Sequence, residues 1–214
     1  MGSLPAATQC DTASGISLPC HDHGYPAAMS VQETPSAEYV VLLDDARQPV
    51  GTMLKSSVHD TETPLHLAFS VYVFRTDGRF LATRRATAKP TWGGVWTNSC
   101  CGHPKPEERP AEAAHRRVAE ELGLVPLTLE LALPDFTYRA VSPEGLVEHE
   151  VCPVFVAVVD TDPLPAPSEV AEWTWVTWSD YRTLASRAPW ALSPWSVSQT
   201  ALLPEDLGNQ TLGR

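Results

Sequence analysis

The feature that most constrains this 214-residue chain is a central run of small and charged residues with fixed spacing. Residues 98–104 place a thiol, a glycine and an imidazole side by side, and an acidic stretch follows. Residues 109–122 are predicted to form a helix, because Pro110 suits a first turn and Gly123 is a stop signal. The spacing reads G-x5-E-x7-R-x3-E-E-x-G and is filled by Gly102, Glu108, Arg116, Glu120, Glu121 and Gly123.

This spacing resembles the Nudix box, a loop-helix-loop that holds a divalent metal beside a diphosphate. The chain departs from the box at one position. Nudix hydrolases carry Arg-Glu-aliphatic where this sequence has Arg116, Arg117 and Val118. A cation therefore stands in place of one metal-binding carboxylate, which makes a plain pyrophosphohydrolase the less favoured interpretation.

Four other segments extend the resemblance in one unbroken order, from about Tyr39 to Leu203. They are residues 59–69, 135–140, 147–153 and 193–195. Together with the Cys-Gly-His sequence at 101–103, they closely resemble the type 1 isopentenyl diphosphate isomerases. The resemblance implies an α/β (α+β) fold, a Nudix-type α/β/α sandwich with a mixed sheet.

Length and composition predict one folded domain with extensions. A chain of this size with 43% hydrophobic residues can bury one good core. We expect residues 1–36, rich in Ala, Ser, Thr, Pro and Gly, to be a disordered extension, residues 37–204 to be the isomerase domain and residues 205–214 a C-terminal tail.

No apolar run approaches the ~20 residues that a membrane-spanning helix needs, and the N-terminus lacks the pattern of a signal peptide. The five cysteines include the adjacent Cys100 and Cys101 and give no spaced disulfide framework. We therefore expect a cytoplasmic protein with reduced thiols and no membrane partner.

The net charge of −11 argues against nonspecific nucleic-acid binding, which depends on Lys and Arg. Nine of the fifteen cationic residues nevertheless lie between Arg75 and Arg117. They form either a solvated basic patch or a site for a small anionic ligand. We expect a small-molecule diphosphate substrate, no nucleic acid, and a monomer or weak homodimer.

Local patterns predict alternating strands and helices. Asp77 and Gly78 indicate a hairpin turn. The strands are expected at residues 38–44, 67–74, 79–84, 129–138, 147–159 and 173–178. Two further helices are expected at residues 179–186 and 193–203.

The segment around residue 149 suggests a metal site. Side chains alternate along a strand, so Glu148 and Glu150 share one face while His149 points away. Any single histidine is more often structural than a ligand. As a set, however, His59, His66, His103, Glu148 and Glu150 offer mixed nitrogen and oxygen ligands that suit Zn²⁺ or Mn²⁺.

The resemblance implies a second ion and an anion site. Glu121 matches an acid that holds Mg²⁺ against the substrate diphosphate, with Cys101 contributing through its backbone carbonyl. Alternatively, Glu121 simply forms an i,i+4 ion pair with Arg117. The family's diphosphate-binding cations match Lys55, Arg85, Lys89 and Arg117.

Moving a double bond requires acid/base groups on both sides of the substrate. The resemblance assigns these roles to Cys101 and Glu150, with Tyr138 assisting. A free cysteine can also be only a small buried apolar group. Trp195 is the candidate for stabilising the carbocation through its indole face. The alternatives are a Nudix pyrophosphohydrolase and a noncatalytic Nudix-like sensor that binds a diphosphate.

Overall fold

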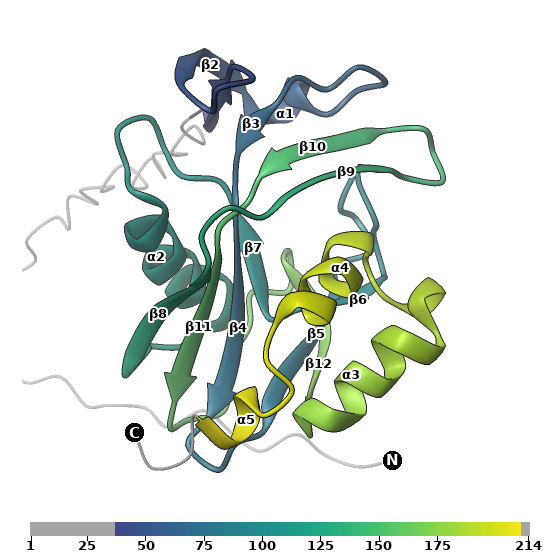
Figure 1. Ribbon diagram of the computed structural model, residues 1–214. Helices are drawn as coiled ribbons and strands as arrows, with labels where there is room; N and C mark the ends of the chain where they lie inside the picture. The colour runs from purple at the N-terminus through teal and green to yellow at the C-terminus, as the bar shows by residue number, and fades with distance from the viewer. Residues whose placement is uncertain (1–36, 211–214) are drawn as a thin grey trace, which may run out of the picture. The chain divides into compact units, whose positions relative to one another are not determined.

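Two sheets organise the computed structural model, which describes residues 37–210 (Figure 1). The first sheet has the order β2-β1-β3-β10-β9, and the second has the order β12-β5-β4-β11-β8, with β6 paired to β5 and β7 to β4. The first sheet contains β1 Tyr39–Leu43, β2 Pro49–Leu54, β3 His66–Leu67, β9 Thr137–Val141 and β10 Val147–Val151. The second contains β4 Phe69–Arg75, β5 Phe80–Arg85, β6 Trp96–Thr97, β7 Cys100–Gly102, β8 Thr128–Leu133, β11 Val154–Val159 and β12 Val170–Val176.

The helices follow the pattern that the sequence predicts, with short additions. They are α1 Lys55–Val58, α2 Pro110–Leu122, α3 Trp178–Arg187, the 3-10 turn η1 Pro189–Ala191, α4 Pro194–Leu202 and α5 Leu207–Gln210. No helix within residues 37–210 is long and apolar enough to span a membrane. The expected extension at residues 1–36 lies outside the described residues, and so do residues 211–214.

Both sheets are mixed, as predicted. β3 pairs with β10 in parallel, and β4 pairs with β11 in parallel. The other pairings between two named strands are antiparallel, including the Asp77–Gly78 hairpin between β4 and β5. Each sheet therefore has one parallel pair near its centre, flanked by antiparallel strands.

Three predicted strands are wrong in extent, because each is two strands that belong to different sheets. The expected strand 147–159 breaks at Cys152 and Pro153, where proline has no N–H to continue the ladder. The expected strand 67–74 breaks beside it at Ala68, whose N–H donates to Val151 O at 2.9 Å. The expected strand 129–138 breaks after Leu133. At these breaks the chain passes from one sheet to the other.

The core has two layers because β4 alternates its side chains. Phe69, Val71 and Val73 pack in a cluster with the buried face of α2. Tyr72 and Phe74 pack in a second cluster with residues of α3 and α4. Figure 1 shows α2 on one side of the second sheet and α3 and α4 on the other. This is the predicted α/β/α arrangement.

The last described residues pack onto the domain. In α5, which falls within the segment expected to be a tail, Leu207 is buried in the same cluster as Tyr72. The domain boundaries that we expected from the sequence remain a prediction.

Helix α2 ends where the sequence predicts. Gly123 adopts φ +64° and its N–H donates to Ala119 O. The chain beyond Pro163 runs back against this end, and Leu164 N–H donates to Leu122 O at 2.8 Å. A Cβ at Gly123 would approach Leu164 O to 2.8 Å.

We predict that Gly123→Ala lowers the free energy of unfolding by about 1–2 kcal/mol, because alanine is strained at positive φ and also meets Leu164. The control is Gly51→Ala in β2, where a Cβ meets nothing within 4 Å. Urea denaturation of both variants provides the measurement. An equal loss in the two variants would contradict this account of the helix end.

Candidate active site

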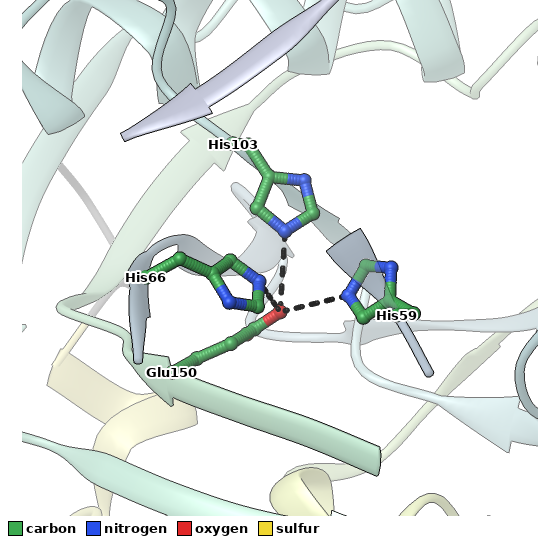
Figure 2. A group of neighbouring side chains, drawn as sticks. All are labelled: His59, His66, His103 and Glu150. Atoms are coloured by element: carbon green, nitrogen blue, oxygen red, sulfur yellow. Dashed lines mark hydrogen bonds and ion pairs between the residues drawn. The ribbon is translucent and has the colours of Figure 1, made fainter. Parts of the chain in front are cut away.

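Three histidines converge on one carboxylate oxygen (Figure 2). Glu150 Oε1 lies 3.2 Å from His103 Nε2, 3.4 Å from His66 Nε2 and 4.0 Å from His59 Nε2. The structure therefore brings together four of the five residues that the sequence predicts as ligands of the transition metal.

Strand register places these groups. Glu150 on β10 lies opposite His66 on the parallel neighbour β3 and opposite Tyr138 on the antiparallel neighbour β9. His59 directly follows α1, and the next residue, Asp60, accepts a hydrogen bond from Val147 N–H at 2.7 Å. His103 follows β7 of the other sheet. The cluster therefore forms where the two sheets meet.

The geometry of the imidazoles suits a metal ion. His66 Nδ1–H donates to Pro64 O at 2.9 Å, which leaves the lone pair of Nε2 directed at the cluster. The buried Nε2 atoms of His59 and His66 have no hydrogen-bond partner among residues 37–210. One ligand atom from each of His59, His66, His103 and Glu150 lies within 4.8 Å of the others. Buried, unpartnered nitrogens around a carboxylate fit a divalent cation.

Charge states in the cluster follow from burial and hydrogen bonding. Burial lowers the pKa of His103 to about 4, so its imidazole is neutral, the form that binds metals. Burial alone would raise the pKa of Glu150, but the neighbouring imidazoles, first among them His103 with its hydrogen bond, hold that pKa well below its ordinary value. Burial raises the pKa of Glu148. Of these two carboxyl groups, Glu150 is therefore the one whose ionised form the site favours.

Glu148 shares the inner face of β10 with Glu150, as the alternation predicts, but its oxygens have other partners. Thr91 Oγ1 donates to Glu148 Oε1 at 2.7 Å, and Tyr138 OH donates to Glu148 Oε2 at 2.7 Å. The same phenol lies 2.9 Å from Glu150 Oε2. Glu148 is therefore outside the four-residue cluster, and its role as a ligand remains a prediction.

The Cys101 thiol is partly buried on β7, opposite Ser70 of β4. Its Sγ atom lies 3.4 Å from Ser70 Oγ and within hydrogen-bonding distance of the Asn98 carboxamide. Burial raises the pKa of Cys101 to about 11, so the group is a protonated thiol at neutral pH. The adjacent Cys100 packs in the cluster below α2, on the other face of the sheet.

Trp195 lies in the first turn of α4 and is 2% exposed. Its ring centroid lies 5.8 Å from that of Tyr138, and the Arg85 guanidinium carbon lies 5.4 Å from it. The indole thus lies beside two other residues that the sequence assigns to the site.

The predicted cations have carboxylate or carbonyl partners. Arg117 contacts Glu121 at 2.5 Å and Glu169 at 3.3 Å, and Lys89 forms an ion pair with the same Glu169. Lys55 pairs with Glu38 at 2.6 Å. Arg85 instead donates two hydrogen bonds to Thr91 O.

Close packing also explains the glycine of the box. A Cβ at Gly102 would approach Phe69 Cζ to 3.0 Å and Arg117 Cγ to 3.3 Å. The backbone of the Cys-Gly-His loop can therefore lie directly against Arg117 only because residue 102 is glycine.

The sequence analysis missed three residues that organise the site. Glu169 joins Lys89 to Arg117, Thr91 joins Arg85 to Glu148, and Asn98 joins Cys101 to Trp195. Glu169 and Thr91 lie in no recognisable motif. Asn98 lies within the central run of residues 98–104, but nothing in its spacing reveals its partners.

The comparisons with known proteins first identify the domain family and the fold. The sequence matches the NUDIX domain family over residues 64–196. A solved structure from Deinococcus radiodurans resembles the fold with a TM-score of 0.62 at 17% identity, over 78% of this chain and 99% of that one. At this identity the likeness supports the fold alone.

Curated relatives define the family more closely. An isopentenyl-diphosphate Delta-isomerase of Frankia alni is 61% identical over 160 residues, which cover 75% of this chain and 82% of the relative. Another, from Kocuria rhizophila, is 56% identical over 80% of this chain and 94% of the relative. The chain therefore belongs to the NUDIX domain family and, within it, to the isopentenyl-diphosphate Delta-isomerases.

We predict that Glu169→Gln lowers the melting temperature at pH 7 but has less effect in acid. Burial opposes the charge of Glu169, but the hydrogen bond from Lys89 dominates and lowers its pKa. A carboxyl group with a lowered folded-state pKa stabilises the fold above its unfolded pKa, about 4.3, and loses that contribution as pH falls through the folded value. The difference in melting temperature between the variant and wild type should therefore be largest at pH 7 and should decrease below about pH 4.

Circular dichroism melts between neutral pH and the acid limit of stability measure this difference. Glu172→Gln is the matched control, since Glu172 lies in the following strand and forms an exposed ion pair with Arg84. A difference that stays constant with pH would show that the Glu169 charge does not stabilise the fold.

Proposed function

We propose that the protein interconverts isopentenyl diphosphate and dimethylallyl diphosphate by protonation and deprotonation through a tertiary carbocation, as a step of isoprenoid biosynthesis. The convergence of Cys101, Glu150, Tyr138 and Trp195 on one region is the observation that carries this mechanism. It rests on their hydrogen bonds and ring contacts.

The reaction adds one proton and removes another. A proton added to the terminal alkene carbon leaves the positive charge on the neighbouring tertiary carbon. Loss of a proton from the carbon on the diphosphate side then forms the new double bond. The proton count is unchanged, so one group must donate while another accepts.

Cys101 and Glu150 are the two groups that we assign to this exchange. They come from different sheets, and they differ in charge, since Cys101 is a thiol and Glu150 a carboxylate. Tyr138 OH, hydrogen-bonded to Glu150 Oε2, assists by relaying or orienting the proton. In the reverse direction the two groups exchange roles.

Trp195 is assigned to the carbocation. Water would trap such a cation, so the reacting carbons must be kept dry. The buried indole excludes water and offers a π face, which stabilises a desolvated cation by roughly 2 kcal/mol. The guanidinium group of Arg85 already lies over the indole ring, which supports the ability of this ring to bind a positive charge.

The diphosphate would be held by Lys55, Arg85, Lys89 and Arg117, together with Mg²⁺ on Glu121 and the Cys101 carbonyl. Ion-pair contacts support this arrangement. Arg117 and Lys89 both pair with Glu169, and Arg117 also pairs with Glu121. An anion between these cations could replace part of their carboxylate pairing.

One Mn²⁺ or Zn²⁺ would be held by His59, His66, His103 and Glu150, with Glu148 as the further ligand. When bound, the ion would supply a fixed positive charge that orients the Glu150 carboxylate and favours its ionised form. The unpartnered imidazole nitrogens support this assignment.

The alternatives fit the site less well. In a pyrophosphohydrolase, clustered metals place water against phosphorus, but here Arg117 contributes a cation where a carboxylate is needed. A noncatalytic sensor that binds a diphosphate would have no use for a thiol and a carboxylate in the same site.

A cytoplasmic location follows from this mechanism, because Cys101 must stay reduced. We also propose a small-molecule diphosphate as the partner, with no nucleic acid or membrane, and a monomer or weak homodimer as the assembly. The net charge of −11 supports the exclusion of nucleic acid.

We predict that Cys101→Ala lowers kcat for isopentenyl diphosphate by roughly 1,000-fold, because it removes one of the two acid/base groups. Cys100→Ala is the matched control, since this neighbouring thiol packs below α2. Steady-state isomerase assays on both variants, with melting curves to check folding, provide the measurement. If Cys100→Ala were the inactive variant, the assignment would be wrong.

We predict that purified protein holds about one tightly bound Mn²⁺ or Zn²⁺ per chain, and that His66→Ala loses it. His149→Ala, on the opposite face of β10, should keep the ion. Elemental analysis after dialysis measures the content directly. Active wild-type protein with neither ion, working on Mg²⁺ alone after chelation, would refute this site.

A further inference from the structure

Asn98 is a fully buried side chain between β6 and β7. Its backbone is fixed by Thr83, whose Oγ1 donates to Asn98 O at 2.7 Å. The following residue is fixed as well, because Ser99 Oγ accepts from Val73 N–H at 2.8 Å and donates to Leu81 O at 2.6 Å. The Asn98 carboxamide is therefore carried by a backbone segment, residues 98–99, that hydrogen bonds hold in place.

The partners of Asn98 determine which way its carboxamide faces. Nδ2 donates to Val71 O at 3.1 Å and to Cys100 O at 2.9 Å. Oδ1 accepts from Trp195 Nε1 at 3.0 Å. Carbonyl oxygens only accept and an indole N–H only donates, so a flipped amide would lose all three bonds.

The same carboxamide holds the Cys101 thiol. Cys101 Sγ lies 3.2 Å from Asn98 Nδ2 and 3.3 Å from Asn98 Oδ1. Ser70 also contacts this sulfur, but its hydroxyl is shared with Cys152 and with Gln199 and does not reach the indole. Within residues 37–210, Asn98 is the side chain with hydrogen bonds to both Cys101 and Trp195.

We propose that Asn98 is a positioning residue that fixes the Cys101 sulfur relative to the Trp195 ring. This inference rests on the proposed function, in which the thiol exchanges the proton and the indole faces the cation. The two groups must approach the same few carbon atoms from set directions. Asn98 does not touch those carbons and acts only through the two side chains that it holds.

Asn98→Ala tests the proposal, with Ser99→Ala as the matched control. Both positions are buried in the same segment, and both variants lose hydrogen bonds. We expect Asn98→Ala to lower kcat roughly 100-fold with KM within about twofold, since misplacement by about 1 Å costs this much. Ser99→Ala should lower the melting temperature and reduce kcat far less than Asn98→Ala, because the Thr83 bond to Asn98 O and all bonds of the Asn98 carboxamide remain. Equal kcat for the two variants would overturn the proposal.

A double-mutant cycle with Trp195→Phe tests the coupling directly, because phenylalanine keeps an aromatic ring but cannot donate to Asn98. If the two residues act together, the fold-loss of kcat in the double variant should be smaller than the product of the fold-losses in the two single variants. Strict multiplication of the two losses would contradict a role through Trp195.

If Asn98→Ala does not fold, Thr97→Val tests the same role with little change of shape. Thr97 Oγ1 donates to Asn98 Oδ1 at 2.9 Å, and loss of this bond should weaken the hold on the carboxamide oxygen and lower kcat severalfold at unchanged KM. A kcat equal to that of Ser99→Ala would reject the proposal. Full activity of Cys101→Ala would instead show that the proposed function itself is wrong.

Discussion

The Glu150 carboxylate is the interaction on which the rest of the site depends. One oxygen faces three imidazoles and the other lies 2.9 Å from the Tyr138 hydroxyl. A buried negative charge is costly unless it is partnered on all sides. Its partners come from separate parts of the chain, so the charge is tolerated only when the sheet register brings them together.

The crossings of the chain from one sheet to the other provide that register. At Ala68 and at Pro153 the chain leaves the first sheet and enters the second, and the two crossings are hydrogen-bonded to each other. The carboxylate on β10 thus belongs to one sheet and the thiol on β7 to the other. A site between the sheets can approach a substrate from two sides, as moving a double bond requires.

The sequence predicts the motif-bearing parts well. The α2 helix and the inner face shared by Glu148 and Glu150 follow from spacing and alternation, and the family follows from the resemblance of five motifs to known isomerases. The breaks within the expected strands do not, because a continuous apolar run is compatible with either sheet. Glu169 and Asn98 are also beyond sequence analysis, since their partners are distant in the chain and only the packed fold brings them into contact.

The most direct test of the account is NMR of isopentenyl diphosphate incubated with the purified protein in deuterated water. The account predicts that deuterium enters the carbon skeleton, that the double bond moves to give dimethylallyl diphosphate, and that no phosphate or pyrophosphate is released. Arg117 in place of a metal-binding carboxylate is the physical reason for the absence of release. Release of phosphate or pyrophosphate without deuterium exchange would contradict it.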